Sequence, residues 1–382
     1  MGSVSSHRPA WAEISASALR SNVVALKSVL GATALCGVVK ANAYGHGVEL
    51  VAPGVLAAGA DSLAVATVDE GVELRESGVT VPILLLAEVP SSSLGDALAS
   101  SLTLTVGSLA GARDVLEAVS QADGVHPVHL KVDTGMHRMG VAPEDVNDVL
   151  DVLASSHHVD VEGIYTHFSV ADGPSGDERG FTRHQIEAFD AVLAATPVHR
   201  RPRVAHLANS AGALGYEQAR RDLARVGLAM YGYLPAAWLA GALEERHVSL
   251  TPVLSLRAKV VAVRRVAAGE RPSYGRRRAL AHDANIVTVP FGYADGFPRR
   301  LFDAGAEVLI SGRRYPLAGS VTMDQLLVDV GDDPVVIGDD VVLLGRQGDE
   351  QITADEWAEL AQTITWEILC GVGARVPRVL VD

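Results

Sequence analysis

A lysine that directly follows a buried apolar segment is the most reactive feature of this sequence. Lys40 follows Val38 and Val39 and precedes the polar stretch from Ala41 to Gly47. Burying an ammonium group is costly, because the charge loses its hydration. Such a lysine either extends its charged end to solvent or has a lowered pKa. In the second case the neutral amine can form a Schiff base with a carbonyl compound.

Small polar residues near two later segments could bind a phosphate group. Ser210 supplies a hydroxyl after the apolar run Val204–Ala208, and Gly227 and Leu228 offer accessible backbone N–H groups. Loops after the seventh and eighth strands of a (β/α)8 barrel often bind phosphate. A phosphate site and a buried lysine on one barrel indicate pyridoxal phosphate as the cofactor.

Short segments rich in apolar and β-branched residues could position these side chains. They are Cys36–Lys40, Ser62–Thr67, Ile83–Glu88, Leu102–Val106, Val128–Asp133, Gly163–Phe168, Val204–Ala208 and Arg225–Met230. Amphipathic helical segments separate them, and this alternation indicates a parallel sheet covered on both faces. We therefore predict a TIM-like (β/α)8 barrel over residues 1–245. A doubly wound open sheet, the alternative, would normally have a glycine-rich loop after the first strand.

The pattern changes after about Glu245, where predicted strands follow one another with few helices. These strands are Leu254–Val263, Ile286–Val289, Val308–Ile310, Leu326–Val330 and Val341–Leu344. One helix is expected to begin at Thr353, because Glu356 gives capping-box spacing. We therefore predict a mostly β domain over residues 246–382, with which roughly the first 10 residues of the chain could also pack.

Composition and charge exclude several classes of partner. The 382 residues carry a formal net charge of −14, which argues against nucleic acid because phosphate binding needs a basic surface. No apolar run resembles a signal peptide or is long enough to cross a membrane. Two cysteines, Cys36 and Cys370, cannot form a disulfide framework. We therefore expect a cytoplasmic protein that binds neither nucleic acid nor membrane.

Several longer motifs together resemble the alanine racemase family, the barrel-type branch of pyridoxal-phosphate enzymes. They extend over nearly the whole chain and are VVKANAYGHG, KVDTGMHRMG, YTHF, HLANSAG, ARVGLAMYG, SYG, GYADG, TMDQ and RVPR. The resemblance implies an isomerase that interconverts L- and D-alanine. It also implies a homodimer in which the β domain of one subunit closes the barrel mouth of the other.

The resemblance further implies two proton-transfer groups on opposite faces of the substrate. Lys40 would carry the cofactor as a Schiff base and act on one face of the substrate Cα, and Tyr274 of the partner subunit would act on the other. Two groups are needed because one fixed group reaches only one face. A phenol has an ordinary pKa near ~10, which must be lowered for a base near neutrality. In the family, a hydrogen-bonded path through His167 to Arg225 does this.

The remaining matched positions would surround the cofactor and substrate. Arg225 would face the pyridine nitrogen, where its permanent positive charge disfavours a proton. The resemblance implies further cofactor contacts from Tyr44, His167, Asn209, Ser210, Gly227 and Leu228, and substrate contacts from Arg138, Met323 and Tyr293. Lys131 matches a lysine that is often carbamylated, which would orient Arg138; without that modification it would repel Arg138. Asp295 and Asp324 are expected to hold loops, and no metal is expected.

One position departs from the family pattern. Before Val376 the family usually has a tyrosine followed by an arginine, whereas this chain has Ala374 and Arg375. Losing the phenol predicts weaker cofactor binding, by about 1 kcal/mol for one neutral hydrogen bond. It also predicts a larger pocket that could accept serine or a bulkier amino acid, unless another aromatic residue such as Phe297 fills the space.

Other functions on the same barrel remain open. The chain could be a racemase for another amino acid in a specialised pathway, a decarboxylase or a non-catalytic pyridoxal-phosphate-binding protein. The non-catalytic proteins lack a second domain, which here contains Tyr274. Decarboxylases generally place a cysteine near the site, but Cys370 lies in a segment that matches the racemase pattern. A metal-assisted aldolase would need a His/Asp pair, and after the domain boundary the sequence has only His247 and His282.

Overall fold

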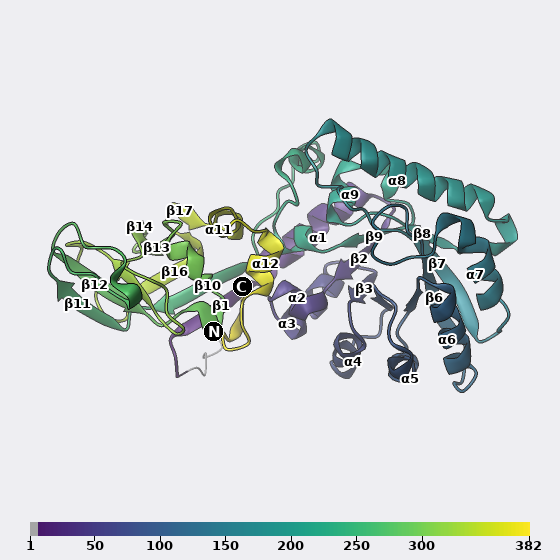
Figure 1. Cartoon of the computed structure of the whole chain (residues 1–382), viewed down its shortest axis with the longest axis horizontal. Coiled ribbons are helices and arrows are strands. Elements are labelled where there is room, and N and C mark those ends of the chain that lie inside the picture. The colour runs from purple at the N-terminus through teal and green to yellow at the C-terminus, as the bar shows by residue number, and fades with distance from the viewer. Residues whose placement is uncertain (1–6) are drawn as a thin grey trace. The chain divides into compact units, whose positions relative to one another are not determined.

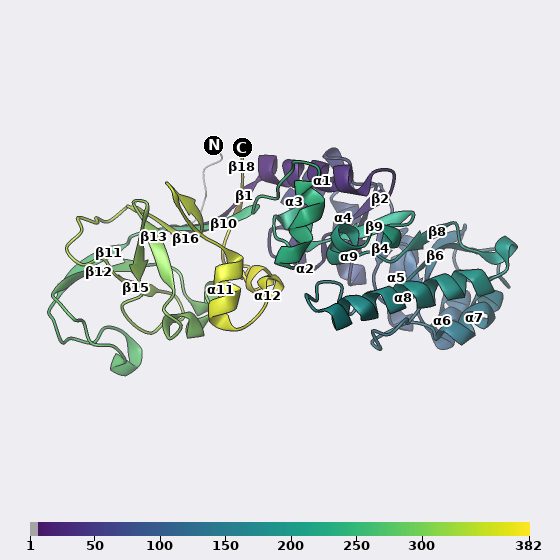
Figure 2. The same ribbon diagram turned by 90° about the horizontal axis from the view of Figure 1, so that it is seen from above.

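The computed structural model describes residues 7–382, which form two compact units (Figures 1 and 2). Unit 1 contains the described residues up to Ala18, together with Tyr44–Leu50 and Pro252–Asp382, and unit 2 contains Leu19–Ala43 and Val51–Thr251. The boundary expected at residues 245 and 246 thus falls before the end of unit 2. The segment Tyr44–Leu50, assigned to the barrel from sequence, groups with unit 1. The expectation of no signal peptide concerns in part residues 1–6, which lie outside the described residues.

Unit 2 is a barrel of parallel strands that pair in sequence order. Its strands within the described chain are β2 (Ala34–Val38), β3 (Ser62–Val65), β4 (Ile83–Leu85), β5 (Leu104–Val106), β6 (His126–Lys131), β7 (Val159–Tyr165), β8 (Val204–His206) and β9 (Leu223–Val226). β9 pairs in parallel with β2, which closes the ring. A bridge between Leu84 and Thr103 and a hydrogen bond from Arg225 to Ala208 join the two halves. The predicted (β/α)8 barrel is confirmed.

Helices alternate with these strands, and Figures 1 and 2 show α4 to α8 outside them. The helices are α1 (Ala16–Leu30), α3 (Val48–Ala57), α4 (Val68–Glu76), α5 (Ser91–Ala99), α6 (Leu109–Val119), α7 (Val146–Leu153), α8 (Gly176–Ala195), α9 (Ser210–Gly215) and α10 (Gly241–Glu244). Apolar residues at helical spacing are buried, as in Leu19, Val23 and Leu26 of α1. Burying one such side chain contributes about 1.5–3 kcal/mol, which holds the helix on the barrel.

Most observed barrel strands end earlier than the sequence predicted. The first was expected to include Lys40, but β2 ends at Val38 and Lys40 begins the short α2 (Lys40–Tyr44). The last was expected over Arg225–Met230, but β9 ends at Val226. The apolar residues beyond these ends are buried in loops, so hydrophobicity alone did not mark where strand pairing stops.

Unit 1 is mostly β, as predicted. Its larger sheet has the order β14-β13-β16-β10-β1-β18 with β17 beside β16, and its smaller sheet has the order β11-β12-β15. The strands are β1 (Ala10–Ser15), β10 (Leu254–Lys259), β11 (Ala262–Val266), β12 (Ala284–Val289), β13 (Glu307–Ile310), β14 (Arg313–Pro316), β15 (Leu326–Asp329), β16 (Asp340–Gln347), β17 (Glu350–Ile352) and β18 (Arg378–Val381). β1 pairs with β10 and β18, so the N-terminal segment joins this domain.

Two helices, α11 (Ala354–Ala361) and α12 (Thr365–Cys370), pack in unit 1. The Thr353 side chain accepts a hydrogen bond from the backbone of Glu356, which confirms the predicted start of α11. Trp357 of α11 is buried against the ring of Phe297, with ring centroids 4.6 Å apart. Within residues 7–382, no helix combines the length and apolarity needed to cross a bilayer.

Candidate active site

Lys40 lies at the carboxyl end of the barrel strands, directly before a left-handed turn. The four residues after it, Ala41–Tyr44, have φ values between 52° and 54°. This conformation costs a residue other than glycine about 1–2 kcal/mol, so other contacts must hold the turn. Glu70 provides one: its Oε1 accepts a hydrogen bond of 2.6 Å from the backbone of Ala41. Its Oε2 accepts from Ala66 and Thr67 at the start of α4.

Cationic side chains gather in this part of unit 2. Burial, together with the charges of Arg138, Arg225 and Lys40, lowers the pKa of Lys131 to about 8. The Nζ atom of Lys131 lies 3.4 Å from the carbonyl oxygen of Leu86. Such a cluster suits a ligand with several negative charges, because each cation is destabilised by its neighbours until an anion binds.

Arg225 is the most deeply buried of these cations and is held from several sides. Its Nη1 donates to Nδ1 of His206 at 2.7 Å, and its Nη2 donates to the carbonyl oxygens of Thr166 at 2.8 Å and Leu207 at 3.0 Å. Nη2 also lies 3.4 Å from Nδ1 of His167, which places the predicted pair in contact. Burial and the nearby cations, Arg225 first, lower the pKa of His167 well below its ordinary value.

The Nε atom of Arg225 is the one donor of this guanidinium that is buried without an acceptor among the described residues. Leaving a buried donor unpaired costs about 1–3 kcal/mol, so an acceptor at this position would stabilise the protein. The nitrogen of an unprotonated pyridine ring is such an acceptor. The residues present therefore fit pyridoxal phosphate.

The residues expected to bind phosphate are adjacent. The Oγ atom of Ser210 accepts hydrogen bonds from the backbone of Gly227 at 2.9 Å and Ala229 at 3.4 Å. Leu228 begins the short turn Leu228–Tyr231. Asn209, expected to contact the cofactor, uses its side-chain oxygen to cap α9 through the backbone N–H of Gly212. The structure thus brings Ser210 and Gly227 together and gives the Asn209 side chain a role in holding their loop.

Tyr44 and Tyr274, also predicted site residues, belong to unit 1. Tyr44 is buried, and this burial raises the pKa of its phenol. Tyr274 follows Ser273, whose φ is 68° and whose Oγ donates to the carbonyl oxygen of Ser320 at 2.6 Å. The Tyr274 side chain is 73% exposed. A fixed backbone therefore presents this phenol on the surface of the single chain.

Tyr293 and Met323, expected near the substrate, lie on two loops of unit 1 that hydrogen-bond to each other. The backbone of Tyr293 donates to Thr322 at 3.0 Å, and that of Ala294 donates to Met323 at 3.0 Å. A Cβ atom at Gly292 would lie 2.4 Å from the Met323 carbonyl oxygen, so only glycine permits this approach. Both predicted side chains are exposed to solvent in the single chain.

An ion-pair cluster holds these loops. Arg8 contacts both carboxylate oxygens of the fully buried Asp295, one of them at 2.7 Å, and Asp295 accepts a hydrogen bond from the backbone of Gly292 at 2.8 Å. Arg375 pairs with Asp324 at 2.7 Å. The expectation that Asp295 and Asp324 hold loops is confirmed. Arg8 was missed, because a single arginine in the N-terminal segment gives no sequence signal.

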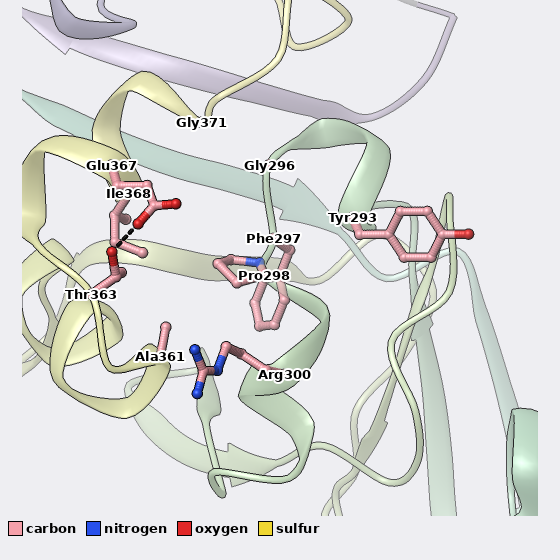
Figure 3. A pocket seen from close by; sticks show the side chains of 10 residues that line it. All are labelled: Tyr293, Gly296, Phe297, Pro298, Arg300, Ala361, Thr363, Glu367, Ile368 and Gly371. Atoms are coloured by element: carbon pink, nitrogen blue, oxygen red, sulfur yellow. Dashed lines mark hydrogen bonds between the residues drawn. The ribbon is translucent and has the colours of Figure 1, made fainter.

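A cavity of about 240 Å³ lies beside the Tyr293 loop in unit 1. Figure 3 shows Phe297 and Pro298 between the hydrogen-bonded pair Thr363 and Glu367 and the ring of Tyr293, which points away from them. Phe297 is fully buried against Trp357, so it belongs to the core of unit 1. Ala374 itself is exposed.

Two histidines without an assigned role connect to Arg225. His206 contacts it directly, and Nδ1 of His129 lies 2.8 Å from Nε2 of His206. His129 precedes Lys131 by two positions in β6, and alternate residues of a strand point to the same face. That alternation is the sequence signal that could have identified His129 as an interior residue.

Comparisons with known proteins agree over nearly the whole chain. Residues 14–235 match the family model of the alanine racemase N-terminal domain, and residues 253–380 match that of the C-terminal domain. An alanine racemase of Symbiobacterium thermophilum is 45% identical over 376 residues, or 97% of each chain. The crystal structure of alanine racemase from E. faecalis aligns with a TM-score of 0.91 at 36% identity, covering 99% of this chain and 100% of that one. A histidine racemase from Leuconostoc mesenteroides aligns with a TM-score of 0.87 at 29% identity, covering 98% and 99%.

Proposed function

The chain belongs to the alanine racemase family, and from that premise we propose that it interconverts L- and D-alanine with pyridoxal phosphate. The observation that carries the proposal is the buried, unpaired Nε of Arg225 in the barrel that also holds Lys40. This donor suits the ring nitrogen of the family's cofactor. The cationic cluster around Lys131 suits the cofactor's negative charges.

The cofactor, when bound, supplies an electron-accepting ring that acidifies the Cα–H bond of the attached amino acid. Lys40 would hold it covalently through Nζ, and Arg225 would donate to the ring nitrogen from Nε. Ser210, Gly227, Leu228 and Tyr44 would hold its phosphate. The permanent charge of Arg225 keeps a proton off the ring nitrogen, which limits side reactions at the substrate.

Two groups of the protein would then move protons at the substrate Cα. Nζ of Lys40 would remove or return a proton on one face, and the phenol oxygen of Tyr274 would do so on the other. The high exposure of Tyr274 in the single chain supports its contribution to a neighbouring subunit, and hence a homodimer. His167 is kept neutral by burial and the nearby cations, so it can accept a hydrogen bond. It would link the phenol of Tyr274 to Arg225, which it contacts.

Lys131 is proposed to be carbamylated. A lysine with a pKa of about 8 has roughly a tenth of its amines neutral at pH 7, and only the neutral amine reacts with carbon dioxide. Carbamylation would replace one cation of the cluster by an anion and would orient Arg138. It would therefore relieve the repulsion that lowers the pKa of Lys131.

A broader substrate range is the second candidate function. Ala374 lacks the phenol usual in the family, and Phe297 is committed to the core, so serine or a larger amino acid gains room. A protein named histidine racemase shares this fold, which supports the capacity of the scaffold for larger substrates.

The thiols of Cys36 and Cys370 suit a reducing environment, and we place the reaction in the cytoplasm.

Incubation of the purified protein with pyridoxal phosphate and single L-amino acids in deuterium oxide tests these proposals. We expect alanine to gain deuterium at Cα and to become racemic, with slower exchange of serine. Exchange without inversion would contradict the two-base mechanism. Absence of exchange with alanine would contradict the proposed function.

A further inference from the structure

A line of side-chain contacts connects Arg225 to the carboxylate of Glu162. Nη1 of Arg225 lies 2.7 Å from Nδ1 of His206, and Nε2 of His206 lies 2.8 Å from Nδ1 of His129. Nε2 of His129 in turn faces Oε2 of Glu162 at 3.8 Å. Four neighbouring strands, β9, β8, β6 and β7, supply these side chains. Arg225, His206 and His129 are almost fully buried, whereas the Glu162 side chain is 27% exposed.

The guanidinium fixes the direction of this line, because it contains donors only. Nδ1 of His206 must therefore accept, so the proton of a neutral His206 is on Nε2. That proton points at Nδ1 of His129, which must also accept. The proton of His129 is then on Nε2, where it faces the Glu162 carboxylate. Each tautomer thus follows from its neighbour.

Charge supports this assignment. Burial, followed by the charges of Arg225 and His129, lowers the pKa of His206 well below its ordinary value, which keeps the ring neutral. The His129 ring, with help from Arg203, holds the pKa of the Glu162 carboxyl below its ordinary value. The line therefore starts at a carboxylate and ends at a guanidinium, with two imidazoles between them.

The backbone is shaped to admit the ring of His129. The pairing of β6 with β7 shifts register between Val128 and His129, and the residue opposite His129 is Gly163. A Cβ atom at position 163 would lie 2.5 Å from Nδ1 of His129, closer than real Cβ contacts. The ring of His206 is held by Tyr165, which stacks on it with ring centroids 4.6 Å apart. Both rings are thus held where the line requires them.

We infer that His129 and Glu162 are positioning residues for the proposed racemase reaction, which act on Arg225 by holding His206 in its Nε2–H tautomer. Without His129, the proton of His206 can move to Nδ1 and point at Nη1 of Arg225. The guanidinium then loses one of its acceptors, and only backbone carbonyls such as those of Thr166 and Leu207 still orient its Nε donor. This inference rests on the proposed function only for its effect on catalysis; the tautomer is a property of the protein itself.

The test compares His129→Leu with His129→Asn in the full-length protein. Asparagine offers an oxygen near the position of Nδ1, so it retains the acceptor for His206, whereas leucine removes it. Proteins labelled with ¹⁵N-histidine, with and without pyridoxal phosphate, report the tautomer through imidazole nitrogen shifts. We expect the Nε2–H form of His206 in wild type and His129→Asn, and a gain of the Nδ1–H form in His129→Leu.

Alanine turnover by the loaded enzymes gives the second readout. We expect kcat to fall roughly 10-fold in His129→Leu with little change in KM, and to recover mostly in His129→Asn. An unchanged His206 tautomer with unchanged kcat in His129→Leu would overturn the inference. Should His129→Leu fail to fold, Glu162→Leu tests the same line at a more exposed position. Unchanged imidazole shifts of His129 and His206 in that variant would also overturn it.

The two proposals fail in distinguishable ways. A wild-type protein that does not racemise alanine contradicts the proposed function, whatever the state of His206. A wild-type protein that racemises alanine but contains His206 in the Nδ1–H form contradicts only the inference made here.

Discussion

At the scale of single residues, burial and charge rather than residue type give the candidate site its properties. Lysine normally titrates near 10.5, yet burial and three neighbouring cations lower the pKa of Lys131 to about 8. Arginine normally pairs with an acid, yet Arg225 donates to backbone carbonyls and a neutral histidine. Both departures are consistent with the proposed binding of pyridoxal phosphate, which carries negative charge and an unprotonated ring nitrogen.

The lowered pKa of Lys131 predicts a pH-dependent effect of its replacement. The pKa of Lys131 is about 8 in the folded protein and near 10.5 in the unfolded chain, so folding releases a proton from Lys131 between these pH values. Its charge therefore lowers the free energy of unfolding fully below about pH 8, and this destabilisation fades as pH rises. Lys131→Met should therefore raise the free energy of unfolding, relative to wild type, more at about pH 7 than at about pH 10. Denaturant unfolding of the apoprotein in buffers free of carbon dioxide measures this. A stability gain of Lys131→Met over wild type that stays constant or grows with pH would contradict the lowered pKa of Lys131.

Replacing Ala374 should change substrate specificity and cofactor affinity in ways that can be measured separately. Ala374→Tyr should lower the ratio of serine to alanine turnover by narrowing the pocket. It should also tighten pyridoxal phosphate binding by about 1 kcal/mol, or roughly fivefold, by adding one hydrogen bond. Ala374→Leu is the matched control, because it adds bulk without a hydroxyl and should change only the turnover ratio. A ratio unaffected by either variant would refute the enlarged pocket.

At the scale of elements, a strained turn and the start of a helix support each other around Lys40. The left-handed turn after Lys40 is held by Glu70, whose carboxylate also accepts hydrogen bonds from the backbone N–H groups of Ala66 and Thr67, just before α4. The sequence TVDE at Thr67–Glu70 indicates a capping box. It does not indicate that the same carboxylate reaches Ala41, because the left-handed turn has no glycine to mark it.

Removing this support should affect both stability and cofactor binding. Glu70→Ala should lower the free energy of unfolding by about 1.5–3 kcal/mol, the range for a hydrogen bond to a charged group, and should weaken pyridoxal phosphate binding. Glu73→Ala, on the exposed side of α4, is the control and should change neither. Equal behaviour of the two variants in denaturant titrations and cofactor binding would contradict this role of Glu70.

At the scale of the whole molecule, the sequence predicted the barrel and the β domain because both have strong periodic patterns. The predicted domain bounds differ from those of the two compact units at Tyr44–Leu50 and after residue 245, because chain order does not reveal which segments pack together. Lys40 and Ser210 were identifiable from type and position, whereas Arg225 was identified only through the family resemblance. His129, Glu162 and Arg8 were not, since their importance lies in partners distant in sequence.

The central claim is that Lys40 and Tyr274 act on one substrate from different subunits. Lys40→Ala and Tyr274→Phe variants should each be nearly inactive, but half of the dimers in a refolded equimolar mixture should combine both chains. Each such dimer would contain one site with both native residues, so the mixture should recover about a quarter of wild-type alanine racemisation. Heterodimers that form, as shown by affinity tags on the two variants, but recover no activity would contradict the claim.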